Sequence, residues 1–595
     1  MREIRYLNKY IFKYKYRFIL GAIFVAGTHV FSIIPARLVK HIFDFVRDSI
    51  DAYQLFKGSP LEAFMYDKFI KGLMVYSGLM LLVTLFKALC SFLLRKAIFS
   101  AANKIEYELK NEIYNHYQTL PLSFYRKNST GDLMARISED VGRVKLYLGP
   151  GMMFGLNSIT LFLLLIPYMF TINVKLTLYS ILPLPLLAIG IFYVSSLLHE
   201  RAEKIQSKLS ALTTFVQETF SGIRVLQAFA REAAFTQNFT QACEDYKARA
   251  LGLTAVNSLF FPLAAGLTGL GIVLTAFVGG KEVMKGNITI GNVAEFIMYM
   301  HLVTWPAASI SLVTSFVQRA AASQKRINEF LQEQNPIVSK KQLVRSIKGD
   351  VAFQDVSFVY PDSGIQALQA VSFKVPAGAS IAIIGTTGSG KSTIANLLTR
   401  LYDANEGLIT IDGVPIQDYA IPSLRQQIGY VPQDVFLFPD TIKNNIAFGT
   451  DKAIDSQIIQ AAQHADLYTS IQRFPQKMET ILGERGVTLS GGQKQRLSIA
   501  RALIREPRIL ILDDSLSAVD TKTERSILKT LRKVMQERTT IIISHRVSVA
   551  RLASQVLVLD AAHVAEQGTH ESLLAARGLY YALYKRQQIQ HKFAK

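Results

Sequence analysis

The sequence predicts a multidomain membrane protein, with an all-α transmembrane domain of six spans in residues 1–325 and an α/β phosphate-loop domain in residues 346–595. Half of the 595 residues are hydrophobic and only 19% are charged, and the apolar residues are concentrated in the first half. In the second half, residues 385–393 read G-T-T-G-S-G-K-S-T between a strand pattern and a helical pattern. A linker is expected over 326–345, because a chain of this length exceeds one core.

Six apolar stretches predict the membrane spans, and each is long enough to cross about 30 Å of hydrocarbon as a helix. They lie near 18–38, 70–93, 150–171, 176–197, 253–278 and 290–317. Very short turns, at 171–175 and 279–287, separate the third span from the fourth and the fifth from the sixth. These turns favour membrane spans over the helices of a soluble core.

The basic residues predict the orientation of the chain. Six lysines and arginines and a single acid precede the first span, so the N-terminus is expected on the cytoplasmic side. Six crossings return the C-terminal domain to that side, where ATP is available. We therefore expect an integral membrane protein, in a bacterial inner (plasma) membrane, with both termini in the cytoplasm.

The net charge of +21 raises nucleic-acid binding as another possibility. The sequence has no basic recognition helix and no interleaved aromatic RNA-binding motif, so lysines and arginines facing anionic lipid explain the charge more simply. Cys90 and Cys243 are too few for a disulfide framework or a zinc site.

The glycine-rich stretch predicts a site for ATP and Mg²⁺. Its glycines allow backbone N–H groups to face phosphate, Lys391 reaches the β and γ phosphates, and the Ser392 hydroxyl is a ligand for Mg²⁺. The residues expected to bind the nucleotide here are Gly385, Thr386, Thr387, Gly388, Ser389, Gly390, Lys391, Ser392 and Thr393.

Polar residues after other apolar strands complete the predicted site. Residues 508–514 read R-I-L-I-L-D-D, so Asp513 is expected to hold Mg²⁺ and Asp514 to orient or deprotonate the attacking water. Gln433 and His545 each follow a short apolar strand and are expected near the γ-phosphate. The predicted catalytic residues are Asp514, His545 and Gln433, and the predicted metal ligands are Ser392, Gln433 and Asp513. Tyr360 is expected to stack on adenine.

The order and spacing of these residues, with L-S-G-G-Q at 489–493, resemble the ATP-binding cassette (ABC) domains over nearly the whole span 346–595. The resemblance assigns Ser490, Gly491, Gly492 and Gln493 to a γ-phosphate held by a second cassette. Residues 480–486 resemble the exporter loop that senses the membrane domain, and 517–520 the loop that crosses to the opposite site. The membrane half resembles the same exporters, whose helices continue into the cytoplasm as two long loops. Here 130–136 with Asp140 resembles the first loop, and Glu218 with 222–225 the second.

The resemblance implies a dimer, because this chain supplies one membrane half and one cassette. It also exposes one departure from the family's pattern: the acidic strand usually ends in Asp-Glu, whereas this chain has Asp513-Asp514. The missing methylene withdraws the carboxylate by about 1 to 1.5 Å, which is enough to slow proton transfer. We expect a heterodimer in which this chain's own site is slow and the partner carries Glu. A homodimer is the alternative.

The transported substrate is weakly constrained by the sequence. The resemblance favours a pump for lipids or hydrophobic drug-like compounds, and an ATP-gated regulator or channel on the same architecture is the alternative. Lys87 lies inside the second span, where a charge is costly, and either binds an anionic group or extends to the interface. His301 and Trp305 in the sixth span are further candidates to line a cavity.

Overall fold

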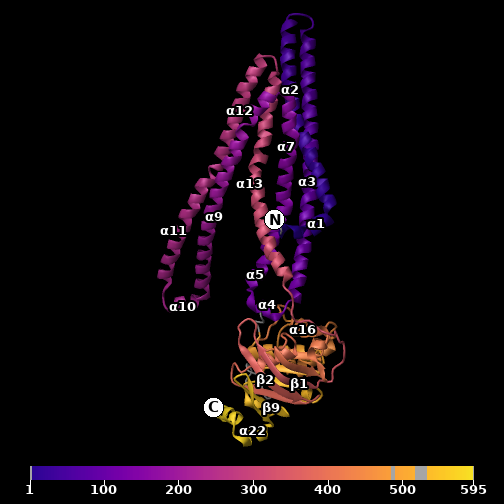
Figure 1. Ribbon diagram of the computed structural model, residues 1–595, viewed down its shortest axis with the longest axis vertical. Coiled ribbons are helices and arrows are strands. Elements are labelled where there is room, and N and C mark those ends of the chain that lie inside the picture. The colour runs from indigo at the N-terminus through magenta and orange to yellow at the C-terminus, as the bar shows by residue number, and fades with distance from the viewer. Residues whose placement is uncertain (1–2, 484–488, 516–528, 530–531, 594–595) are drawn as a thin grey trace. The chain divides into compact units, whose positions relative to one another are not determined.

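The computed structural model describes residues 3–483, 489–515, 529 and 532–593. The chain forms two compact units. Unit 1 consists of Met1–Gln118 and Gly131–Glu333, and unit 2 consists of Thr119–Thr130 and Gln334–Lys595. Figure 1 shows that the first unit is built of long helices and that the second contains the strands.

Unit 1 contains six helical stretches that are long and apolar enough to cross a membrane, and each contains one predicted span. The first, second and sixth are the helices α2 (Lys15–Leu55), α3 (Glu62–Thr119) and α13 (Ile290–Gln332). The third combines α5 (Thr130–Ala135), a π-helical turn (Arg136–Asp140), α6 (Val141–Leu146), a second π-helical turn (Tyr147–Gly151) and α7 (Met152–Ile172). The fourth combines α8 (Val174–Ile181) and α9 (Pro183–Ser221), and the fifth α11 (Glu232–Asn257) and α12 (Phe260–Met284). A 3-10 turn (Glu3–Leu7) and α1 (Asn8–Lys13) precede them, and α10 (Ile223–Ala228) joins α9 to α11. The prediction of six spans is confirmed.

Capping explains where two of these helices begin. The Asn173 side chain accepts a hydrogen bond from the Leu176 N–H at 2.9 Å, which starts α8 directly after α7. Thr289 and Asn292 form a reciprocal capping box that starts α13. The turn predicted over 279–287 is shorter than expected, because α12 continues to Met284.

Helix α13 is the centre of unit 1, where it packs against α2, α7, α9 and α12. Figure 1 shows α9 and α11 side by side as far as the short α10, the arrangement expected of the second long loop. Outside these contacts, many large apolar side chains remain exposed, including Leu81 at 69% and Leu85 at 67%. Such exposure is expected where a helix faces lipid or a second chain.

Unit 2 contains two sheets. The four-stranded sheet has the order β2-β1-β4-β5 and is antiparallel. The six-stranded sheet has the order β10-β9-β3-β8-β7-β6, in which only β10 runs antiparallel. The strands are β1 (Val351–Val359), β2 (Gln366–Val375), β3 (Ser380–Gly385), β4 (Glu406–Ile411), β5 (Val414–Pro415), β6 (Ile428–Val431), β7 (Ile509–Asp513), β8 (Thr539–Ile543), β9 (Gln555–Asp560) and β10 (His563–Gly568). Strands β7 and β8 are buried along their whole length, as expected for parallel strands covered on both faces.

Unit 2 also contains helices in its described residues. They are α4 (Leu122–Lys127), α14 (Lys391–Leu398), α15 (Ile421–Gln426), α16 (Ile442–Ala447), α17 (Asp455–His464), α18 (Tyr468–Ile471), α19 (Gly491–Leu503), α21 (Val547–Ala550), α22 (His570–Ala576) and α23 (Leu579–Phe593), with 3-10 turns at Ile416–Asp418 and Lys477–Glu479. Helix α4 comes from the first half of the chain, and its Leu122 packs on the core of unit 2. In the segment expected as a linker, residues 326–332 are the end of α13.

Candidate functional site

The parallel strands of the six-stranded sheet bring the predicted site residues to one edge. Strands β3, β8, β7 and β6 are neighbours that run in the same direction, so their carboxyl ends lie together. The phosphate loop follows β3, Asp513 ends β7 and Asp514 follows it, His545 follows β8, and Gln433 follows β6. In open α/β sheets, ligands bind at this edge.

The backbone of the phosphate loop requires glycine at two positions. At Gly390, φ is +93°, and a Cβ atom would lie 2.0 Å from the carbonyl oxygen of Ala367. A Cβ atom at Gly385 would lie 2.2 Å from the carbonyl oxygen of Leu559. Helix α14 begins at Lys391, directly after this turn, so its first N–H groups belong to the loop. This strand, loop and helix form the arrangement that binds phosphate through backbone N–H groups.

The Lys391 ammonium lies against the loop that precedes it. It donates hydrogen bonds to the carbonyl oxygens of Gly385 at 3.1 Å and Thr386 at 2.6 Å. Burial lowers the pKa of Lys391, while the carboxylates of Asp514 and Asp513 oppose that shift. A cation held by neutral carbonyls in this way is available to an incoming phosphate.

The two strongest candidates for holding Mg²⁺ are in contact. The Ser392 hydroxyl donates a hydrogen bond to Oδ1 of Asp513 at 2.9 Å. Burial raises the pKa of Asp513 to about 6, the neighbouring charge of Asp514 adds to the shift, and the Ser392 hydrogen bond opposes it. Among the described residues, no group of three or more His, Cys, Asp or Glu could hold a metal ion. A hydroxyl beside a carboxylate fits Mg²⁺, which is usually bound by few protein oxygens together with substrate phosphates.

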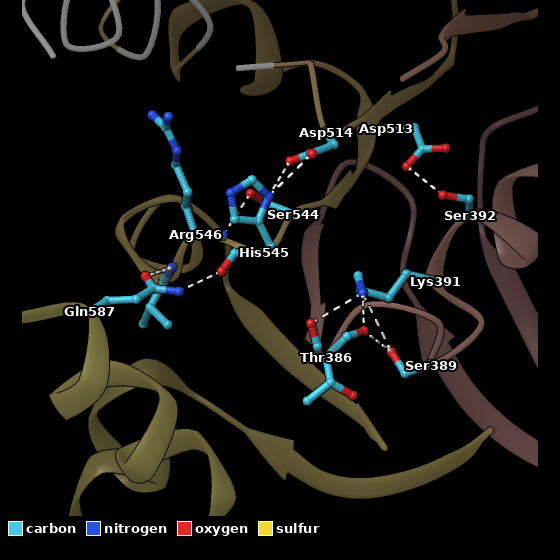
Figure 2. Close-up of polar contacts among 12 residues, drawn as sticks. Thr386, Ser389, Lys391, Ser392, Asp513, Asp514, Ser544, His545, Arg546 and Gln587 are labelled. Carbon is cyan, nitrogen blue, oxygen red and sulfur yellow. Dashed lines mark hydrogen bonds and ion pairs between the residues drawn. The ribbon is translucent and has the colours of Figure 1, made fainter. Parts of the chain in front are cut away.

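Asp514 and His545 form a second contact at the same edge. Nδ1 of His545 lies 2.9 Å from Oδ1 and 3.1 Å from Oδ2 of Asp514 (Figure 2). The Asp514 side chain is largely buried, at 15% exposure, whereas that of His545 is 51% exposed. The φ of Asp514 is +45°, a left-handed conformation that aspartate adopts more readily than most residues. The structure therefore brings together Lys391, Ser392, Asp513, Asp514 and His545.

Gln433 and Tyr360 lie at the ends of their strands. Gln433 is exposed two residues after β6. Tyr360 follows β1, and its hydroxyl lies 3.0 Å from that of Thr393 in the phosphate loop. Sequence reasoning missed Arg126 of α4, whose guanidinium carbon lies 5.2 Å from the centre of the Tyr360 ring. A guanidinium at this distance makes a cation–π contact with the predicted adenine platform.

Sequence reasoning also missed Gln587, in α23. Its side-chain amide contacts the main chain on both sides of Arg546, next to His545 (Figure 2). The available signal was the spacing of Tyr580, Leu583, Tyr584 and Gln587, which places them on one face of a helix.

The signature L-S-G-G-Q begins helix α19. Ser490 is its N-cap: the hydroxyl accepts from the Gln493 N–H at 3.3 Å, and the Ser490 N–H donates to the Gln493 side chain at 2.9 Å. Ser490 and Gly491 are exposed, so the helix N-terminus is open to a ligand. Of the two other motifs, 517–520 and the end of 480–486 lie outside the described residues.

The candidates within the spans lie on two helices, α3 and α13. Lys87 is half-buried in α3. His301 and Trp305 are exposed on α13, Trp305 at 58%. Exposure in one chain fits contact with lipid, with a cavity or with a second chain.

Residues 18–307 match the ABC transporter transmembrane region, and residues 368–517 match the ABC transporter domain. The chain is 40% identical over 522 residues to the probable multidrug resistance ABC transporter ATP-binding/permease protein YheI of Bacillus subtilis, covering 87% of this chain and 89% of that protein. It is 35% identical to the multidrug resistance-like ATP-binding protein MdlA of Escherichia coli, covering 87% and 88%. It is 34% identical to the ATP-dependent lipid A-core flippase of Syntrophus aciditrophicus, covering 85% and 84%.

Proposed function

This chain belongs to the ABC transporter family as an exporter half-transporter, and on that premise we propose that it exports or flips lipids or hydrophobic drug-like compounds as one half of a heterodimer. The relatives are a probable multidrug resistance transporter, a multidrug resistance-like protein and a lipid A-core flippase. These three names fit amphipathic or apolar compounds that reach the protein from the membrane. The large exposed apolar surface of α3 supports this route of entry.

In the proposed site, Tyr360 stacks on adenine and the N–H groups of the phosphate loop bind the phosphates together with Lys391. Ser392, Asp513 and Gln433 would hold Mg²⁺, which would neutralise charge on the β and γ phosphates. Asp514 and His545 act next to the γ-phosphate. Because a carboxylate can only accept, the contact between them requires the proton on Nδ1 of His545, which leaves Nε2 for the phosphate or the attacking water.

One observation supports the proposed heterodimer: an aspartate follows Asp513, where the family usually has glutamate. The Asp514 side chain is one methylene shorter than that of glutamate. Both of its carboxylate oxygens lie within 3.1 Å of Nδ1 of His545. A carboxylate that stabilises its neighbour and reaches less far is a poor base for water. The partner then carries Glu, and the L-S-G-G-Q of this chain completes the faster site on that partner.

ATP binding by two such cassettes would draw them together and favour the outward-open state of the membrane domains, which is alternating access by a population shift. We place the protein in a bacterial inner membrane with both termini in the cytoplasm. The basic N-terminal residues and the six spans support this orientation.

Uptake into inverted membrane vesicles tests the proposed transport. Vesicles containing this chain and the chain that co-purifies with it should accumulate a fluorescent lipid or dye above the outside concentration only with Mg²⁺ and ATP. Ser490→Ala should abolish the accumulation if the signature of this chain completes the faster site. A channel or regulator would let the probe equilibrate without concentrating it, and that result would contradict a pump.

A further inference from the structure

The segment that carries His545 is anchored by a residue far away in the sequence. Gln587, in the middle of α23, donates a hydrogen bond from Nε2 to the carbonyl oxygen of His545 at 2.5 Å. Its Oε1 accepts a hydrogen bond from the N–H of Val547 at 2.8 Å. One side-chain amide thus satisfies two backbone groups of the connection between β8 and α21, which no strand or helix pairs.

Other backbone N–H groups of this connection also donate hydrogen bonds. The Ser544 N–H donates to the carbonyl oxygen of Ile383 in β3 at 3.1 Å. The Arg546 N–H donates to the Ser544 hydroxyl at 3.0 Å. Gln587 is therefore the contact that fixes the backbone of His545 itself, on its carboxyl side. Asp514 contacts the ring of His545, so the backbone and the ring of this residue have hydrogen-bond partners in different elements (Figure 2).

Helix α23 is anchored without the help of Gln587. The Tyr580 side chain is fully buried, and its hydroxyl lies 2.6 Å from Nδ1 of His570. The Glu566 carboxylate of β10 accepts hydrogen bonds from the N–H groups of Leu579 and Tyr580 at the start of the helix. Arg551, which follows α21, donates to the Tyr584 hydroxyl at 3.1 Å. The helix is thus a fixed support from which Gln587 reaches the His545 segment.

We propose that Gln587 is a positioning residue for ATP cleavage, which holds the backbone of His545 so that its imidazole meets the γ-phosphate. A displacement of about 1 Å in a catalytic group can cost about a hundredfold in rate. Loss of the Gln587 amide frees the His545 carbonyl and the Val547 N–H, and the connection can then shift. This inference rests on the proposed role of His545.

Single-turnover cleavage separates positioning from a structural role. The complex of the full-length chain with the chain that co-purifies with it, in lipid nanodiscs and in excess over γ-labelled ATP, reports the rate at this chain's own site when the catalytic Glu of the partner is replaced by Gln. Gln587→Ala should lower this rate constant about tenfold and change the affinity for ATP by less than about twofold. The matched control is Gln588→Ala, because Gln588 is exposed and bonds only to the Tyr584 hydroxyl among the described residues. An unchanged rate in Gln587→Ala, or an equal loss in Gln588→Ala, would overturn the proposal.

Gln587→Glu tests the same contact even if the alanine variant folds poorly. The ionised carboxylate can accept from the Val547 N–H but repels the His545 carbonyl oxygen, whereas the protonated carboxyl donates to it as the amide does. The rate of Gln587→Glu, divided by that of the unchanged chain at the same pH, should rise as the pH falls from about 8 to about 5.5. A ratio that is independent of pH would contradict the proposed contact.

His545→Ala distinguishes this inference from the proposed function. If His545→Ala slows cleavage and Gln587→Ala does not, only the positioning role is wrong. If His545→Ala cleaves ATP as fast as the unchanged chain, the proposed role of His545 is wrong, and the positioning role is overturned with it.

Discussion

Nδ1 of His545 lies within 3.1 Å of both carboxylate oxygens of Asp514, although the two residues follow different strands of the same sheet. This contact fixes the tautomer of the imidazole and neutralises part of the aspartate charge. The two side chains should therefore act together.

A double-mutant cycle tests whether Asp514 and His545 act together in ATP cleavage. Asp514→Ala and His545→Ala should each slow single-turnover ATP cleavage, and the double variant should be about as slow as the slower single variant. Losses in rate that multiply would show that the two side chains act independently.

The raised pKa of Asp513 predicts how Mg²⁺ affinity depends on pH. Burial raises this pKa to about 6 from the ordinary value near 3.8, so the free protein holds a proton on Asp513 below about pH 6. Bound Mg²⁺ requires the carboxylate, so its affinity should be highest above pH 6 and fall by up to about tenfold per pH unit below it.

Titration of Mg²⁺ at a fixed concentration of a fluorescent ATP analogue, at several pH values, measures this effect. The control is Asp513→Asn, which should bind Mg²⁺ more weakly and lose the part of the pH dependence that the protein supplies. The titration of the analogue's own phosphate is common to both proteins and cancels in the comparison. An identical pH dependence in the two proteins would contradict the assignment.

Alanine substitutions at two glycines of the phosphate loop, Gly390 and Gly388, test its geometry as a variant and its matched control. A methyl group at Gly390 would collide with the carbonyl oxygen of Ala367 at 2.0 Å, whereas nothing lies within 4 Å of a methyl group at Gly388, and both residues have positive φ. Gly390→Ala should lower the free energy of unfolding of unit 2 by about 3 kcal/mol or more, and Gly388→Ala by about 1 kcal/mol. Thermal unfolding followed with and without ATP measures both effects, and equal losses would contradict this loop geometry.

Tyr360 provides a test of nucleotide binding that is independent of catalysis. Removal of the ring in Tyr360→Ala should weaken ATP binding by about tenfold or more, since stacking on a base contributes about 1–3 kcal/mol. Tyr360→Phe keeps the ring and loses only the contact with the Thr393 hydroxyl, so it should bind nearly as well as the unchanged chain. Equilibrium binding without Mg²⁺ measures both affinities. Equal affinities in the alanine variant and the unchanged chain would show that adenine lies elsewhere.

The membrane spans and the residues at strand ends could be predicted from the sequence, and the reasons are physical. A membrane span requires a continuous apolar stretch, and parallel strands bring their carboxyl ends to one edge, so hydropathy and strand patterns locate both. The contacts of Lys391, Ser392, Asp513, Asp514 and His545 follow from that sheet order.

Residues that reach the site from distant elements could not be predicted in the same way. Arg126 precedes Tyr360 by more than two hundred positions and meets it only because α4 folds into unit 2. Gln587 looks like an ordinary polar residue of a terminal helix, and its role depends on how α23 packs beside α21. Asp140 was expected in a coupling loop, but the sequence does not reveal that it is buried and paired with Arg326 of α13.

The ATPase activity of the purified full-length chain in lipid tests the central claim most directly. Without its partner the chain should turn over ATP slowly, and Asp514→Asn should change that rate little, because the amide oxygen, unlike an alanine methyl group, can still accept a hydrogen bond from Nδ1 of His545. In the complex with the partner, Asp514→Glu should raise the rate at this chain's own site, because the added methylene returns the carboxylate to the reach of the attacking water. Rapid hydrolysis by the unchanged chain that is lost in Asp514→Asn would show that Asp514 is a fully competent base, and would contradict the slow site and the heterodimer inferred from it.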